Sequence, residues 1–303
     1  MPLRHGLSCA AAAVVLAAVV PIASAQDVWR MVPALESRRT GTLRDRDLSE
    51  SSGVAASRHH PGVLWSINDS GHPASLFATD TLGRSLGVIA VTGARNVDWE
   101  AVAAGPCEAT PGTCLYIADT GDNRERRESV RLYRVPEPAV GPGAPRATAR
   151  AAALRLRYPG GPRDVEAVFV DGSGAVHLIS KGWDRVVHHY RVPAAAWRRG
   201  EATADAMDPL PLAVGRAAGR LVTDAAVSPD GSVVAVRTYA EVFLFRLAPD
   251  GELVAGARVA CELGALDLLG EGIDWLDGHR LVLTSEGVLG TAGTVSVARC
   301  PSG

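Results

Sequence analysis

The chain has 303 residues, of which 47% are apolar and 21% are charged, and its formal net charge is −2. This composition excludes a disordered protein, which would contain fewer apolar residues and more charge. It also excludes a polybasic nucleic-acid-binding protein, because the chain has no basic excess with which to neutralise phosphates.

Residues 1–25 have the pattern of a secretory signal peptide. A short basic start precedes the apolar stretch Cys9–Ile22, and Ala23-Ser24-Ala25 then satisfies the small-x-small cleavage rule. The stretch is short and lacks a basic stop-transfer flank, so we expect cleavage before Gln26 and no membrane span in the mature chain. We expect residues 26–303 to form a single domain in the periplasm or the medium.

A short strand with a polar or acidic first residue recurs along the mature chain, followed each time by a second apolar strand. The five first strands are expected to begin at Ser52, Glu100, Glu166, Asp224 and Glu271. Turn sequences such as Asp171-Gly172 and Asp277-Gly278 separate the paired strands. A β-sandwich is the competing architecture, but it would not repeat an acidic residue at every cycle.

This periodicity predicts an all-β fold, a β-propeller of four-stranded antiparallel blades. Five blades can be counted, and six remain possible if residues 27–48 form more structure. The last blade lacks one strand after Thr294–Arg299, and we expect the N-terminal segment Val28–Leu35 to complete it and close the ring.

The mature chain contains four cysteines, which an exported protein can oxidise. Three pairings are possible. We favour Cys107–Cys114 within one loop and Cys261–Cys300 as a C-terminal link. A zinc site is the alternative, but neither pair has the Cys-x-x-Cys spacing typical of one.

In a propeller, the starts of the first strands and the ends of the second strands meet at one mouth of the central channel. The sequence therefore predicts a carboxylate cluster there, and oxygen ligands suit a hard cation such as calcium. The alternatives are that each acid accepts hydrogen bonds from backbone N–H groups, or that a basic ligand compensates the acids. The candidate metal ligands are Glu100, Asp119, Asp122, Glu166, Asp224 and Glu271.

Other polar residues fall at or near the ends of the second strands. Lys181 is the only lysine of the chain, and the three asparagines of the mature chain lie in or beside the same loops. A solvated lysine and ordinary turn asparagines are the alternatives. The candidate substrate-binding residues are Asn68, Asp69, Asn123, Lys181, Arg237 and Glu286.

Several short motifs resemble secreted bacterial β-propellers of the TolB/NHL-like and phytase-like (esterase-like) group, over nearly the whole mature chain. They are Asn68-Asp69-Ser70-Gly71, Asp98-Trp99-Glu100, Gly121-Asp122-Asn123-Arg124, Ser228-Pro229-Asp230-Gly231 and Arg237-Thr238-Tyr239. The resemblance implies carboxylate-bound calcium, with lysine and arginine side chains around an anionic substrate.

Two functions are expected from these observations. The first is a calcium-dependent hydrolase of small ester or phosphoester substrates, phytase-like or lactonase-like, for which no catalytic residue is assigned. The second is a non-catalytic propeller whose mouth binds a protein, peptide or glycan. In either case we expect a monomer that does not bind nucleic acid.

Overall fold

The structure is a computed structural model. It describes residues 34–108, 111–148, 150–212, 221–263, 269–287 and 291–300, with the backbone alone at 256–260. The expected signal peptide, residues 1–25, lies outside these ranges. The chain from Val32 onward forms one compact unit, and within the described part no helix has the length and apolar character needed to cross a membrane.

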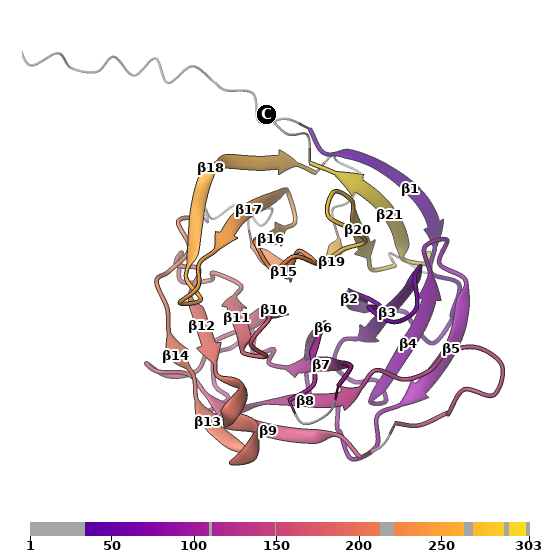
Figure 1. Cartoon of the computed structure of the whole chain (residues 1–303), viewed down its shortest axis with the longest axis horizontal. Coiled ribbons are helices and arrows are strands. Elements are labelled where there is room, and N and C mark those ends of the chain that lie inside the picture. Colours follow the sequence, from indigo (N-terminus) through magenta and orange to yellow (C-terminus); the bar gives the residue numbers. More distant parts are fainter. Residues whose placement is uncertain are drawn as a thin grey trace, which may run out of the picture. The chain divides into compact units, whose positions relative to one another are not determined.

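The described residues form five antiparallel β-sheets arranged around a central axis, so the expected five-bladed propeller is confirmed (Figure 1). From the axis outward, the strands of blade I are β2 (Ser51–Ala56), β3 (Val63–Asn68), β4 (Ser75–Asp80) and β5 (Ser85–Ala90). Those of blade II are β6 (Trp99–Pro106), β7 (Thr113–Asp119), β8 (Val130–Pro136) and β9 (Ala152–Arg157).

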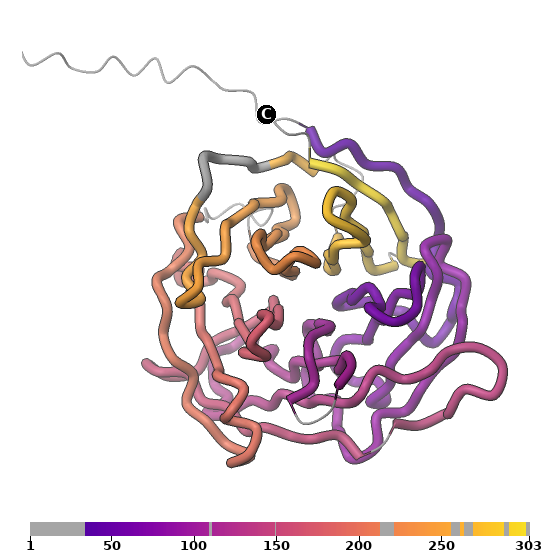
Figure 2. The backbone as a smooth tube through the Cα atoms, viewed as in Figure 1, coloured from indigo at the N-terminus to yellow at the C-terminus, as the bar shows by residue number. Residues whose placement is uncertain are grey.

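The remaining blades follow in chain order around the ring (Figure 2). Blade III contains β10 (Val165–Val170), β11 (Val176–Ser180), β12 (His189–Val192) and β14 (Asp205–Ala206). Blade IV contains β15 (Val222–Val227), β16 (Val233–Thr238), β17 (Glu241–Leu247) and β18 (Leu253–Glu262). Blade V contains β19 (Gly270–Trp275), β20 (Leu281–Ser285), β21 (Thr294–Arg299) and β1 (Glu36–Thr42).

Blade II carries one additional strand, β13 (Glu201–Thr203), which pairs with β9 in parallel. The one short helix described, η1 (Ala194–Arg198), precedes it. The chain therefore visits the edge of blade II between the third and fourth strands of blade III, and this exchange ties two neighbouring blades together.

The hydrophobic core is divided into five clusters, one between each pair of neighbouring blades. Trp65 of blade I and Trp99 of blade II, for example, are fully buried in the same cluster. Each sheet is therefore covered on both faces. For this reason the sequences of its strands are short runs of apolar residues and not long alternations of apolar and polar residues. Burial of apolar area between blades supplies most of the favourable free energy of folding.

The ring is closed by an N-terminal strand, as expected, but the strand is β1 and not the segment Val28–Leu35. Strand β1 pairs with β21 from Glu36 opposite Arg299 to Thr42 opposite Thr294. The sequence signal was misleading because β1 is a polar, largely exposed edge strand without an apolar alternation. Of the expected segment, residues 28–33 lie outside the described ranges.

Strand β1 also contacts blade I, across the junction that it closes. The hydroxyl of Thr40 donates a hydrogen bond to Thr81 O. At Gly41 an added Cβ atom would lie 2.0 Å from Leu82 O, so only glycine allows the two backbones to approach this closely. The first described strand of the chain therefore links blade V to blade I.

Both expected disulfide bonds are confirmed. Cys107–Cys114 closes a loop with a sequence separation of 7, within blade II. Cys261–Cys300 spans a sequence separation of 39 and joins β18 of blade IV to the residue after β21 of blade V. The second disulfide therefore reinforces the part of the ring in which the last blade is completed.

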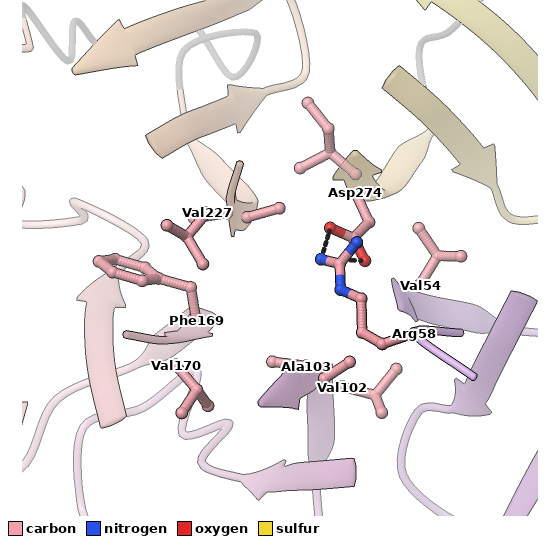
Figure 3. A pocket seen from close by; sticks show the side chains of 12 residues that line it. Val54, Arg58, Val102, Ala103, Phe169, Val170, Val227 and Asp274 are labelled. Atoms are coloured by element: carbon pink, nitrogen blue, oxygen red, sulfur yellow. Dashed lines mark hydrogen bonds and ion pairs between the residues drawn. The ribbon is translucent and has the colours of Figure 1, made fainter. Parts of the chain in front are cut away.

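Side chains of the five inner strands line a small pocket at the axis of the propeller (Figure 3). Apolar residues of all five inner strands, among them Val54, Val102 and Phe169, leave a cavity of about 10 Å³, which is at the lower limit of the space that holds one water molecule. At the end opposite the starts of the inner strands, Arg58 forms an ion pair with Asp274 at 3.2 Å. Asp274 also accepts a hydrogen bond of 2.6 Å from the backbone N–H of Ala56, across the junction of blades V and I.

A buried chain of polar side chains lies between blades III and IV. His177 Nε2 lies 3.2 Å from Asp171 Oδ2, and His177 Nδ1 lies 2.9 Å from His189 Nε2. If His177 Nε2 donates a hydrogen bond to the Asp171 carboxylate, then Nδ1 of the neutral His177 ring must accept one from His189 Nε2. In a neutral His189 that donates from Nε2, Nδ1 carries no proton. Within the described residues this buried atom has no hydrogen-bond partner. Burial lowers the pKa of His177 and lowers that of His189 to about 3.

We expect the two disulfides to differ in their contribution to stability. Removing Cys261–Cys300 by the double substitution C261A/C300A should lower the free energy of unfolding by about 4 kcal/mol, and C107A/C114A by about 2 kcal/mol, because the longer loop restricts the unfolded chain more. Urea unfolding of both variants measures the difference. A larger loss for C107A/C114A would contradict the assigned role of the longer link.

The buried histidines should make stability depend on pH. The unfolded chain protonates His189 near pH 6.5, whereas the folded chain does so only near pH 3, so acidification favours unfolding across that range. Relative to the H189Q variant, the wild type should lose about 2 kcal/mol of unfolding free energy between pH 7 and pH 5. Denaturant titrations at each pH measure this difference. The exposed control H279Q should follow the wild type; equal pH dependence of wild type and H189Q would contradict the expectation.

Candidate functional site

A bulge at the start of each inner strand defines the mouth of the propeller. In all five blades the first and third residues of the inner strand pair with consecutive residues of the second strand, so the second residue of the inner strand is left unpaired. A bulge of this kind re-aims one side chain. The five bulged residues are Ser52, Glu100, Glu166, Thr223 and Glu271.

A second set of five residues follows the ends of the second strands. In each blade, one residue of the second strand pairs with the first residue of the inner strand. The next residue along the chain belongs to this set. These residues are Asp69, Thr120, Lys181, Tyr239 and Glu286. Contacts connect the two sets, because Glu166 meets Lys181 within blade III and Glu271 of blade V meets Tyr239 of blade IV.

Carboxylates from blades I, II and III converge into two overlapping groups at the mouth. We call Asp69, Asp98 and Glu100 the first carboxylate group; one ligand oxygen from each lies within 4.8 Å of the others. The second carboxylate group consists of Glu100, Asp164 and Glu166, under the same distance limit. Glu100 belongs to both groups.

Crowding raises the proton affinity of the first carboxylate group. The pKa of Asp98 rises to about 6, because of its burial and then because of the Asp69 carboxylate beside it. Burial and the Glu166 carboxylate hold the pKa of Glu100 well above its usual range. A cation placed among these oxygens would relieve the repulsion that otherwise retains protons there.

Gly121 leaves room for the first carboxylate group. A Cβ atom at this position would lie 2.0 Å from Glu100 Oε1 and 2.6 Å from the nearest atoms of Asp98. The backbone N–H of Gly121 donates to Asp98 O at 3.1 Å, which holds the loop against the start of the inner strand. The loop thus approaches both carboxylates closely because its residue here has no side chain.

Donors already engage the second carboxylate group. Lys181 Nζ lies 2.8 Å from Glu166 Oε1. Asp164 accepts hydrogen bonds of 2.7 Å from the backbone N–H of Asp122 and from the indole N–H of Trp183. The Glu166 carboxylate raises the pKa of the Lys181 ammonium despite its burial, so the lysine stays charged.

Blade V contributes two further acids to the mouth, Glu271 and Glu286, and blade IV contributes the hydroxyl of Tyr239. The Tyr239 hydroxyl donates a hydrogen bond of 3.1 Å to Glu271 Oε1. Burial, followed by the charge of Glu286, raises the pKa of Glu271 to about 7. Burial, followed by the charges of Asp69 and Glu50, raises that of Glu286 to about 7 as well. These carboxyl groups are therefore able to exchange protons near neutral pH.

Of the expected metal ligands, Glu100, Glu166 and Glu271 lie at the mouth, and Glu100 and Glu166 share one carboxylate group. Asp224 lies elsewhere. Thr223 occupies the bulged position of blade IV, and Asp224 is the next residue. Its carboxylate accepts hydrogen bonds from the backbone N–H of Ile273 at 2.9 Å and of Ala225 at 2.8 Å. Asp224 therefore links blades IV and V, because one residue along a strand reverses the direction of the side chain.

Asp119 and Asp122 also have internal partners in place of an expected shared cation. Arg127 donates to Asp119 Oδ1 at 2.8 Å. Asp122 Oδ2 accepts the backbone N–H groups of Arg126 and Arg127, each at 2.6 Å. These two acids shape the loop after β7, which carries Gly121.

Two expected substrate-binding residues, Arg237 and Asn68, are buried and bonded within the protein. Arg237 is fully buried and donates to Gly272 O at 2.6 Å and to Thr284 O at 2.8 Å. Asn68 is buried and bonds to the backbone at Asp47 and Glu50. Asn123 is exposed in the loop after β7. Asp69, Lys181 and Glu286, in contrast, lie at the mouth.

Sequence reasoning missed Asp98, Asp164 and Tyr239. The first two share a visible signal, since Asp-x-Glu occurs at the start of two inner strands, as Asp98-Trp99-Glu100 and Asp164-Val165-Glu166. Tyr239 has no comparable signal: only the register of β15 and β16 shows that it, and not Arg237, follows the paired end of its strand.

Comparison with known proteins adds little to this geometry. No family model matches the chain, and no curated protein matches it. Among solved structures, 583 chains match. One of them is a gluconolactonase from Xanthomonas campestris, which is 14% identical to this chain, with a TM-score of 0.45 over 89% of this chain and 97% of that chain.

Proposed function

We propose that this protein is a calcium-dependent hydrolase of small ester or phosphoester substrates, phytase-like or lactonase-like in its chemistry. The observation that carries the proposal is the convergence of the first carboxylate group, in which three acids from two blades crowd within reach of one ion. Oxygen ligands of this type suit calcium.

The residues present fit a hard cation. Asp69, Asp98 and Glu100 would hold it, in the space that Gly121 leaves open. Bound there, the ion would polarise a carbonyl or phosphoryl oxygen and acidify a water molecule. The acids of the neighbouring blades and Lys181 would surround the same space.

The other groups at the mouth have the chemistry that hydrolysis requires. Lys181, held by Glu166, presents an ammonium that stabilises negative charge developing on a substrate oxygen. Glu271, with a pKa of about 7 and a hydrogen bond from Tyr239, is suited to take a proton from the attacking water.

We further propose that the protein is exported and acts as a monomer in the periplasm or the medium. Two disulfide bonds in a chain of this size suit an oxidising compartment. A small anionic substrate is compatible with the mouth once a cation offsets its carboxylates. A protein or glycan ligand is the alternative occupant.

Calcium should stabilise the protein through the first carboxylate group. At a calcium concentration 100-fold above the dissociation constant, ligand binding should raise the melting temperature by about 5 °C or more. The D98N substitution should abolish this rise, because it removes a ligand charge. Thermal melts with calcium and with chelator measure the effect.

D224N is the matched control for D98N. Asp224 is also a buried acid of an inner strand, but its carboxylate bonds to backbone N–H groups. The D224N variant should melt at a lower temperature than the wild type and still respond to calcium. A wild type that does not respond, or a D98N variant that responds fully, would contradict the assignment of the ion.

Turnover should depend on Glu271 separately from the ion. On a panel of phosphomonoesters, phosphodiesters, aryl esters and lactones, E271Q should lower kcat about 100-fold or more on the substrate that the wild type turns over. Its calcium-induced rise in melting temperature should stay, because Glu271 lies outside the first carboxylate group. Calcium binding without turnover on any of these substrates would favour the non-catalytic binding function.

A further inference from the structure

The two carboxylate groups share Glu100 but differ in their surroundings. In the second carboxylate group, Asp164 accepts two hydrogen bonds and Glu166 is ion-paired. In the first group, Glu100 is close to a neutral hydroxyl, that of Ser52, at 3.3 Å. The second carboxylate group is thus paired with the positive charge of Lys181, whereas no such ion pair is formed by the first group among the described residues.

Lys181 is held in the second carboxylate group by three separate contacts. Its ammonium is ion-paired with Glu166 at 2.8 Å, and its side chain is only 12% exposed. Its backbone N–H donates to Asp164 O at 2.9 Å. The ammonium also lies 5.6 Å from the centre of the Trp183 ring, a distance at which cation–π attraction operates.

Trp183 is fixed although it is half exposed. Its side chain belongs to the turn after β11, and the residue is 49% exposed. Its indole N–H donates to Asp164 Oδ2 at 2.7 Å, so the ring is anchored to the same carboxylate group that surrounds Lys181. The ring therefore covers the ammonium and limits the positions that the lysine side chain can reach.

A carboxylate shared between two oxygen clusters is the arrangement that two-metal hydrolytic centres use, where paired ions contact the attacking and leaving oxygens. Here a lysine ammonium, which is a compact point charge, is paired with Glu166, a member of one of the clusters. Removing it would leave buried carboxylates without compensation, which is strongly unfavourable unless another cation replaces it.

We propose that Lys181 occupies the second cation position of a carboxylate centre laid out for two, so that the mouth binds one metal ion and one built-in ammonium. The proposal rests on the proposed function for the identity of the first ion. It makes Lys181 the residue that sets the metal stoichiometry. The only lysine of the chain thereby supplies a positive charge that no change in metal concentration removes.

Calorimetric titration with calcium chloride, after treatment with chelator, tests the proposal. The wild type should bind one calcium ion per chain. K181M, which keeps the length of the side chain and removes its charge, should bind two, because the second carboxylate group then lacks its cation. K181Q is the second variant, with the same expectation, in case K181M does not fold.

Two control variants separate charge from packing. K181R keeps the positive charge and should bind one ion. The double variant K181M/E166Q also removes a ligand charge from the second carboxylate group, and should return to one ion. A K181M/E166Q variant that still binds two ions would show that the additional ion lies elsewhere, and would overturn the proposal.

The outcomes distinguish this proposal from the proposed function. One ion in the wild type and one ion in both K181M and K181Q would overturn the role of Lys181 and leave the calcium site in place. No ion in the wild type would overturn the calcium-dependent function. If K181M then bound one ion that K181M/E166Q did not bind, the role of Lys181 would still be supported.

Discussion

The bulge at the start of each inner strand is the constraint on which the mouth depends. It leaves one residue per blade unpaired, and in three of the five blades this residue is a glutamate. Without the bulge, the side-chain period of two would direct these residues toward neighbouring blades, where the core admits small side chains. Gly53, one residue after the bulge of blade I, shows this limit: a Cβ atom there would lie 3.0 Å from the backbone of Ala101.

The mouth assembled in this way concentrates negative charge that the fold itself only partly compensates. Glu100, Asp164, Glu166 and Glu271 are buried, and Lys181 is the cation that pairs directly with one of them among the described residues. Burial and mutual repulsion therefore raise carboxyl pKa values, and protons take the place of a counter-ion. Such a site is costly to the free folded chain, and a cation bound there would stabilise it, which is the usual relation between binding and stability.

Sequence reasoning recovered the architecture because turns, apolar strands and the disulfides repeat or pair in recognisable ways. It recovered Glu100, Glu166, Lys181 and Asp69 at the mouth because they stand at the ends of clearly apolar strands. It misplaced the closing strand because β1 is polar and exposed, and because β1 pairs with a distant strand: Glu36 of β1 lies opposite Arg299 of β21, 263 residues further along the chain. It misplaced Asp224 and Arg237 because a bulge shifts the register by one residue, and no local pattern records that shift.

Asp224 and Glu100 show that acidic residues near the start of an inner strand can have different roles. Both are buried, and both lie near the start of an inner strand: Glu100 at the bulged position, and Asp224 one residue after it. Asp224 reaches a neighbouring backbone N–H and so replaces a hydrogen bond that the edge of the next strand would otherwise lack. Glu100 meets other carboxylates and a hydroxyl, which satisfy it only poorly. Between these two acids, Glu100 is therefore the better candidate ligand, since a carboxylate whose oxygens already accept hydrogen bonds from backbone donors has little capacity left to coordinate an ion.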